Sequence, residues 1–399
     1  MSTGTAIKSS QDAVTRGDLA TATADSSRQV RKQRGFGTNT FKSAVTVSVA
    51  LFLTCAIAEC LARFLACMTV PADGKDRAFD AKMLLATQLA DNKEPAVIFI
   101  GNSISNQGIY ADLVEERLRQ KGLALKVVNL ATTGSCIQEK LELLNAACTP
   151  KSGPRLVVFQ ISPAELEQEL AQNSAPTSEF FNSYVGRNSK FRPASMPLSF
   201  WDKCFNSLDQ YSYLSRYRKH WCQYLHSAIN YITNPEASRS RGPIPYVHSQ
   251  VSLAGWSPWY GFVSDQDLDR YTQTSWRDFT EKTGKLPTRK WLWDFSNIEM
   301  MRDFCNAHKL PLTALWMPEL ADKTILYSGK NITPEECTAK VAPWLTLNNI
   351  DFIDLRKANL ERTDFSTWNH HNALGAVHIS EILAQRLSDY QFAKQFGKK

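Results

Sequence analysis

The longest apolar run of the chain lies near its start. Between Ala44 and Val70 the only charged residues are Glu59 and Arg63. A helix of that length would measure about 40 Å, which exceeds the hydrocarbon core of a bilayer. We therefore predict one transmembrane helix at residues 43–70, with Glu59 and Arg63 paired on one face near its far end.

Residues 1–42 are rich in Ser, Thr, Ala and charge and contain almost no large apolar side chains, so we expect a disordered tail. Basic residues gather just before the helix, at Arg28, Arg31, Lys32, Arg34 and Lys42. Residues 71–80 carry mixed charge, so the positive-inside rule places the tail in the cytosol and the remainder in the periplasm or outside the cell. A cleaved signal peptide and a lipoprotein site at Cys67 are the alternatives, but a charged region of about 42 residues is long for a signal peptide.

Apolar runs alternate with helical spacing after a short helical stalk at residues 71–94. An unbroken apolar run predicts a strand buried on both faces at residues 96–100. Further strands are predicted at residues 125–130, 156–159, 311–316 and 350–353. Helices are predicted at residues 109–121, 136–148, 291–308 and 376–387. This alternation indicates an α/β fold for residues 95–399, with a mostly parallel sheet and helices on both faces.

The alternation stops between about residues 170 and 288, where Ser, Asn, Pro and aromatic residues dominate. This stretch is predicted to be an insertion into the α/β domain. Its tyrosines and tryptophans could stack on sugar rings or fill a small core of their own.

Charge and cysteine content exclude some classes of function. The net charge of +7 is concentrated in the tail, which leaves no basic surface typical of nucleic-acid binding. The nine cysteines form no C-x-x-C pair and have no histidines at zinc spacing, so neither a metal nor another cofactor is predicted. The six cysteines beyond the apolar run could form disulfides outside the cytosol or stay as buried thiols.

Loops that follow strands are where a parallel sheet binds its ligands. The first such loop, residues 101–108, places Ser103 at the head of a helix, whose N–H groups favour an anionic intermediate. A serine there could equally be a plain helix cap. Ser105 is a second candidate nucleophile, although its side chain should point away.

The second and third loops supply the partners that a nucleophilic serine needs. Gly134 is expected to open a helix and to offer an N–H beside that of Ser103, as in an oxyanion hole. His370 lies in the last loop and could accept the serine proton near neutral pH. We expect its ring to lie close to the Ser103 hydroxyl. His371 is the alternative base, and a polar residue capping the last helix is the alternative role for His370.

These blocks, in this order, resemble the SGNH (GDSL-type) hydrolase superfamily, which has a flavodoxin-like three-layer sandwich. The resemblance covers roughly residues 95–170 and 290–390. The Glu59-x-x-x-Arg63 end of the anchor, Ile161-Ser-Pro163 and His370-His371-Asn372-x-x-Gly375 look more closely like membrane-anchored bacterial SGNH proteins. Several of these act in O-acylation of exported polysaccharides or cell-wall polymers, beside a multi-pass membrane-bound O-acyltransferase.

The resemblance implies a role for each matching residue. Ser103 would be the nucleophile and His370 the general base. The N–H groups of Ser103 and Gly134 would bind the oxyanion, and Asn102 and Asn106 would support this site or contact substrate.

Three positions depart from the family pattern. Asn102 replaces the usual aspartate before the serine, and residues 161–165 contain no asparagine to serve as an oxyanion donor. Thr367 occupies the position of the aspartate that orients the histidine. Asp364, six residues before His370, is expected to substitute for it.

The expected function is transfer or hydrolysis of an acyl group, acetyl being favoured, on an exported glycan or another acyl ester through an acyl-serine. The alternative is a catalytically silent scaffold that binds a glycan or a membrane-bound O-acyltransferase.

Overall fold

The computed structural model describes residues 36–68, 77–162, 165–166, 180–216, 233, 255–256, 292–318, 325–327, 330–332, 334–356, 358–367 and 369–390. The chain forms two compact units, Met1–Leu61 and Ala62–Lys399. The predicted disordered tail up to residue 35 and most of the predicted insertion lie outside the described residues.

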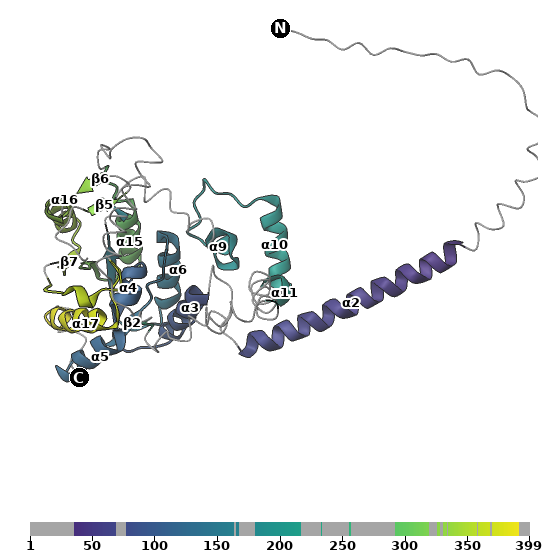
Figure 1. Cartoon of the computed structure of the whole chain (residues 1–399), viewed down its shortest axis with the longest axis horizontal. Helices are drawn as coiled ribbons and strands as arrows, with labels where there is room; N and C mark the ends of the chain where they lie inside the picture. Colours follow the sequence, from purple (N-terminus) through teal and green to yellow (C-terminus); the bar gives the residue numbers. More distant parts are fainter. Residues whose placement is uncertain are drawn as a thin grey trace, which may run out of the picture. The chain divides into compact units, whose positions relative to one another are not determined.

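The predicted apolar segment forms one continuous helix, α2, at Phe36–Met68 (Figure 1). It begins within the segment that was predicted to be a tail. Its stretch Lys42–Arg63 is 22 residues long and is apolar enough to cross a membrane. The membrane crossing itself, its direction and the Glu59–Arg63 pair stay predictions.

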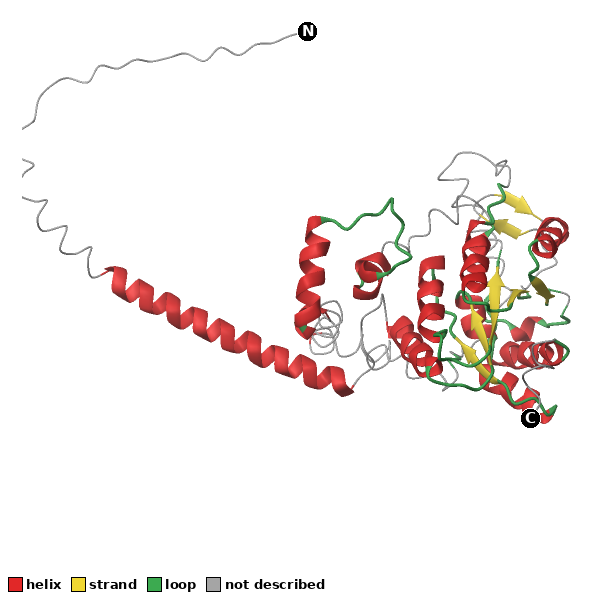
Figure 2. Cartoon of the chain, turned by 180° about the vertical axis from the view of Figure 1, so that it is seen from behind, coloured by secondary structure: helices red, strands yellow, loops and turns green. Residues whose placement is uncertain are grey.

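The second unit contains a parallel sheet, as the alternation of strands and helices predicts. Its five described strands are β1 at Ala96–Ile100, β2 at Lys126–Asn129, β3 at Arg155–Ile161, β4 at Leu312–Trp316 and β7 at Asp351–Asp354. They lie in the order β2-β1-β3-β4-β7. Figure 2 draws the strands in yellow and the helices in red. All neighbouring pairs are parallel. Every residue of β1 and β3 is buried, because both faces of the sheet are covered.

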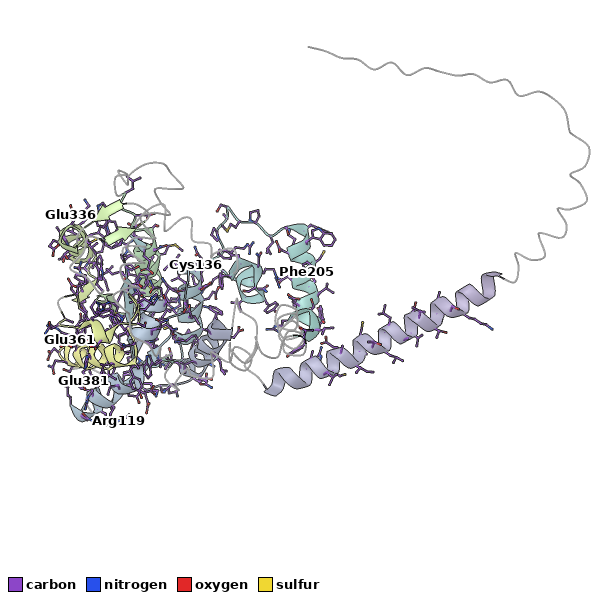
Figure 3. The ribbon with its side chains drawn as sticks, viewed as in Figure 1. Arg119, Cys136, Phe205, Glu336, Glu361 and Glu381 are labelled. Carbon is purple, nitrogen blue, oxygen red and sulfur yellow. The ribbon has the colours of Figure 1, made fainter. Side chains whose placement is uncertain are left out.

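Helices cover both faces of this sheet. The first face packs against α3 (Arg77–Ala90), α6 (Ile137–Ala147), α15 (Ser296–Ala307) and α16 (Pro334–Leu347). The second face packs against α5 (Ala111–Gln120) and α17 (Ala373–Ser388). Alternate residues of β1 face the two layers, with Ile98 in the first core cluster and Phe99 in the second. An ion pair between Arg117 and Glu381, the latter labelled in Figure 3, joins α5 to α17 at 2.5 Å.

Three details differ from the expected pattern. The expected stalk contains α3, whose Phe79 is fully buried in the first core cluster, so this helix belongs to the domain core. The helix expected at residues 109–121 is preceded by a separate short helix, α4, at Ser103–Gly108. The helix α16 and an antiparallel pair, β5 (Ile325–Tyr327) with β6 (Lys330–Ile332), were not predicted.

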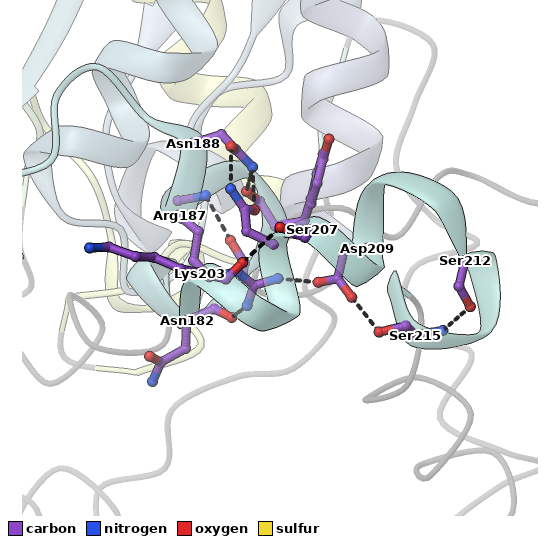
Figure 4. Close-up of polar contacts among 12 residues, drawn as sticks. Asn182, Arg187, Asn188, Lys203, Ser207, Asp209, Ser212 and Ser215 are labelled. Carbon is purple, nitrogen blue, oxygen red and sulfur yellow. Dashed lines mark hydrogen bonds and ion pairs between the residues drawn. The ribbon is translucent and has the colours of Figure 1, made fainter. Parts of the chain in front are cut away.

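Residues 180–216 of the predicted insertion contain short helices. They include α9 at Tyr184–Asn188, α10 at Phe200–Tyr211 and α11 at Tyr213–Arg216. A buried ion pair joins Arg187 of α9 to Asp209 of α10, and Ser215 of α11 donates to the same carboxylate at 2.6 Å (Figure 4). This polar network fixes how the three short helices pack on one another.

The final helix begins at a tightly built corner. Asn372 caps α17, because its side-chain oxygen accepts from the N–H groups of Leu374 and Gly375, each at 3.0 Å. Its side-chain amide donates to Thr363 O at 2.7 Å. A Cβ at Gly375 would lie 2.0 Å from Asp364 O, so only glycine allows this close approach. The Asn372-x-x-Gly375 spacing therefore fixes the loop that carries His370.

We predict that Gly375→Ala destabilises the domain by about 1–3 kcal/mol, because the new methyl group meets a backbone carbonyl that cannot rotate away. Helix propensity alone predicts the opposite sign, since alanine is favoured over glycine inside a helix. Urea unfolding of the full chain, followed by tryptophan fluorescence, measures the change. The exposed α17 variant Gln385→Ala is the control, and a Gly375→Ala variant as stable as this control would contradict the close approach.

Candidate functional site

The loop after β1 presents Ser103 as the first residue of α4. Asn102 is the cap of this helix, and its side-chain oxygen accepts from Ile104 N at 2.9 Å. The backbone N–H of Asn102 donates to the side-chain oxygen of Gln160 on β3 at 3.0 Å. Asn102 therefore holds the turn before Ser103, which is a supporting role.

Gln160 is a site residue that the sequence reasoning missed. It is almost fully buried, and a Cβ on Gly101 would lie 2.7 Å from its side-chain oxygen, so the β1 loop packs directly on it. A polar side chain after the four apolar residues 156–159 of β3 was the signal that could have identified it. In a strand that is covered on both faces, almost every residue is apolar, so a glutamine there is unusual.

The loop after β2 is bonded to the loop of Ser103. Asn129 is fully buried and donates to Ser105 O at 2.9 Å and to Ile109 O at 3.0 Å. The Ser135 hydroxyl donates to Gly101 O at 2.9 Å. These bonds set the two loops side by side at the carboxyl ends of neighbouring strands.

Gly134 does not open a helix, contrary to expectation. It lies in a turn with φ +59°, and α6 begins three residues later at Ile137. This left-handed conformation favours glycine. The residue is exposed and next to Ser135, so it lies on the loop that contacts Gly101.

Ser103 and His370 meet, as predicted. The Ser103 hydroxyl lies 2.9 Å from Nε2 of His370, across a sequence separation of 267 residues. Both side chains are partly buried. The contact has the length of a hydrogen bond, so a proton can pass directly between the two groups.

The other ring nitrogen of His370, Nδ1, contacts Thr367. The hydroxyl oxygen of Thr367 lies 2.9 Å from it. The same hydroxyl oxygen accepts from the backbone N–H of His370 at 3.1 Å and lies 3.3 Å from the side-chain oxygen of Asn369. The hydroxyl has one proton, which can point to the side-chain oxygen of Asn369 and so leave the lone pairs facing His370. In that tautomer Nδ1 carries the ring proton, and the lone pair of Nε2 is directed at Ser103.

Burial lowers the pKa of His370 below its ordinary value. The hydroxyl of Thr367 is neutral and therefore does not counter this effect as a carboxylate would. The ring is consequently neutral at pH 7 and is available to accept a proton.

His371 is fully buried, and burial lowers its pKa to about 3. Its ring packs against Phe365 at 4.8 Å between centroids, and a Cβ on Gly108 would lie 2.7 Å from its Nδ1. The alternative in which His371 serves as the base is therefore not supported by its position.

Asp364 does not orient His370, contrary to expectation. Its buried carboxylate accepts from Glu361 N at 2.8 Å and lies 2.9 Å from Nδ1 of His378 on α17. It supports the corner at the start of α17, while Thr367 makes the contact with the imidazole.

The other candidates in the first loop are buried. Ser105 is fully buried, so it is not an accessible nucleophile, and Asn106 is 6% exposed, which leaves little of it to contact a substrate. After β3, where the family pattern has an asparagine, Glu165 accepts from Ser162 N at 2.9 Å and pairs with Lys140.

Trp256, a residue of the predicted insertion, contacts the segment 101–108 that carries Ser103. This contact was not predicted from the sequence. The indole N–H of Trp256 donates to Gln107 O at 2.8 Å, and its ring stacks on Tyr110 at 4.0 Å. The buried ammonium of Lys82 donates to Asn129 O at 2.7 Å and also to Gly255 O. These bonds attach residues 255–256 to the loops that carry Ser103.

Within the described residues, no three His, Cys, Asp or Glu side chains gather as a metal site, and the cysteines described there form no disulfide. No protein-family model and no curated protein matches the chain. The side-chain geometry therefore carries the functional inference.

Replacing Thr367 tests whether its hydroxyl sets the tautomer of His370. Thr367→Val removes the acceptor from Nδ1–H, and an unpaired buried donor costs about 1–3 kcal/mol, so we expect Ser103 to react roughly 10- to 100-fold more slowly. The measurement is the rate at which a fluorophosphonate labels Ser103. Thr367→Ser keeps the hydroxyl and should react at nearly the native rate; equal rates for the Val and Ser variants would exclude this role.

The pH dependence of the same labelling reports the charge state of His370. Only the neutral ring accepts the serine proton, and its lowered pKa keeps the native protein reactive below about pH 6.5. In Thr367→Asp a carboxylate stabilises the imidazolium and raises the pKa, so the acid limb of the profile should move to higher pH. A shift to lower pH, or none, would show that residue 367 does not act on the ring.

Proposed function

We propose that the chain is a membrane-anchored serine enzyme of acyl-ester chemistry, with a Ser103–His370 dyad oriented by Thr367. The observation that carries this proposal is the 2.9 Å contact between the Ser103 hydroxyl and Nε2 of His370, with Nδ1 held by a second hydroxyl. Serine is a weak nucleophile at neutral pH, and a neighbouring neutral imidazole is the usual group that activates it.

In the first half of the reaction Ser103 Oγ attacks the acyl carbon and passes its proton to Nε2. The carbonyl double bond opens to an oxyanion, which then re-forms the carbonyl as the ester C–O bond breaks. The departing alkoxide takes the proton from the imidazolium, so the products are a free alcohol and an acyl-serine with neutral His370.

In the second half a hydroxyl group of water or of a sugar attacks the acyl-serine. His370 takes the proton of the attacking group and returns it to Ser103 Oγ as that oxygen leaves. Water yields hydrolysis, and a sugar hydroxyl yields acyl transfer. Which one prevails depends on how well the site excludes water and positions the acceptor.

The backbone N–H of Ser103 is the first candidate donor to the oxyanion, because the first N–H of a helix has no partner within that helix. The loop of Gly134 lies beside it through the Ser135–Gly101 bond and is the candidate source of a second donor. Neither Glu165 nor Asn106 adds one, since Glu165 pairs with Lys140 and Asn106 is buried.

The proposed substrate is an O-acylated polysaccharide or cell-wall glycan, with acetyl as the acyl group. An apolar helix that anchors the chain, with the catalytic domain on the extracytoplasmic side, favours such a substrate over a cytosolic metabolite. A multi-pass membrane O-acyltransferase is the proposed partner, since it could supply acyl groups from the cytosolic side.

A catalytically silent scaffold is the second candidate, and one observation favours it. Among the described residues it is the hydroxyl of Thr367 that contacts Nδ1 of His370, so a neutral group stands where a triad has the carboxylate that stabilises the imidazolium. In that case the same domain would bind a glycan or the acyltransferase without turnover.

The full chain should hydrolyse a small chromogenic acetyl ester, and Ser103→Ala should abolish the turnover. We expect His370→Gln to lower the rate by about 100-fold or more, because it removes the general base and keeps a polar side chain of similar size. Initial rates at pH 7 measure both effects.

Ser105→Ala is the matched control, since it removes a buried hydroxyl that bonds no other described residue. It should retain turnover and labelling by a fluorophosphonate. Neither turnover nor labelling in the native chain, with folding verified by circular dichroism, would reject the enzyme and favour the scaffold.

A further inference from the structure

Helix α10 exposes an apolar face. The side chains of Phe200, Trp201, Leu208 and Tyr211 are 70%, 67%, 53% and 78% exposed. With about 100° between successive residues, these four and Phe205, labelled in Figure 3, fall within an arc of about 140°. Soluble proteins rarely expose so many large side chains on one helix, so this face has a function in binding.

The polar face of α10 is the one that packs against its own domain. Asp209 is buried in its ion pair with Arg187, and Asn206 donates to the side chain of Asn188 at 2.7 Å (Figure 4). This arrangement is the reverse of an ordinary amphipathic helix. The buried ion pair fixes the rotation of α10, so its aromatic residues must face outward.

The end of α10 contacts Arg63. Arg63, the last residue of Lys42–Arg63, donates to Tyr211 O at 2.8 Å and lies 4.9 Å over the ring of Tyr213. Arg63, Tyr211 and Tyr213 all belong to the unit Ala62–Lys399. If Lys42–Arg63 crosses a membrane, Arg63 lies at the membrane surface, and so does the residue that it contacts.

The composition of this region fits the surface of an anionic bilayer. Trp and Tyr are the residues that favour the headgroup level, where the ring is apolar on one side and hydrated on the other. Residues 180–216 carry five basic and two acidic side chains, and Lys203 on α10 is exposed. Anionic lipids attract such a positively charged segment.

We propose that α10 is an interfacial helix, whose aromatic face inserts at the headgroup level of the bilayer that α2 crosses. The buried Arg187–Asp209 pair holds the helix in the orientation that insertion requires. The inserted face gives the domain a second attachment to the membrane, next to the end of its anchor. This inference rests on the membrane crossing of α2 and is independent of the acyl chemistry.

The test uses the full chain in vesicles of phosphatidylcholine and phosphatidylglycerol that contain a lipid with a photoactivatable group near the headgroup. Peptides carrying lipid after illumination are identified by mass spectrometry. We expect the peptide of residues 200–211 to be labelled about tenfold more than the peptide containing Leu347, a side chain that is 82% exposed on α16.

The variant F200S/W201S/L208S changes only exposed side chains, so it should fold and lose labelling over residues 200–216. The variant L347S/L374S, which changes exposed side chains of α16 and α17, should keep it. Labelling of 200–211 no stronger than that of the Leu347 peptide would overturn the proposal. In the same vesicles an amine-reactive bifunctional reagent reports self-association, and cross-links between Lys203 of two chains in place of lipid labelling would overturn the proposal too.

Discussion

The hydrogen bond between Ser103 and His370 joins two loops that lie 267 residues apart, and the local structure of both loops is organised to make it. On one side the Asn102 cap and the buried Gln160 hold the turn before the serine. On the other side Asn372 and Gly375 build the corner that carries the histidine. The parallel sheet brings both loops to the carboxyl ends of its strands. Each of these groups acts on the dyad through backbone position, and none needs to touch a substrate.

The contact of a neutral hydroxyl with Nδ1 distinguishes this dyad from a charged triad. Thr367 can fix the tautomer and the orientation of His370, because it accepts the Nδ1 proton and the backbone N–H of the same residue. It cannot supply a negative charge to the imidazolium that forms when the serine proton is taken. Burial lowers the pKa of His370, and the neutral hydroxyl of Thr367 does not raise it again as a carboxylate would. The ring therefore stays neutral over a wider pH range but stabilises the transferred proton less. In the proposed enzyme the base is therefore neutral and correctly oriented, but the driving force for proton transfer to it is modest.

Much of the fold could be predicted from the sequence, because short apolar stretches alternate with segments of helical spacing, and the loops of Ser103 and His370 follow two of these stretches. Side-chain contacts were harder to predict. Asp364 and Thr367 both precede His370 by a few residues, and spacing alone does not tell which one meets the ring. In the folded loop, which is closed by a bridge between Phe365 and His371, Thr367 contacts it. Gln160 and Trp256 reach the site from a strand and from the insertion, so no local pattern linked them to Ser103. The outward apolar face of α10 follows from one buried ion pair, which periodicity alone does not reveal.

Mass spectrometry of the chain after brief exposure to an activated acetyl ester tests the central claim most directly. If the dyad operates as proposed, the peptide containing Ser103 gains one acetyl group, and the gain fades as the acyl-serine is hydrolysed. The same exposure of His370→Gln should leave that peptide unmodified over the same time. Acetylation confined to lysines, or equal acetylation of Ser103 with and without the imidazole, would contradict the account.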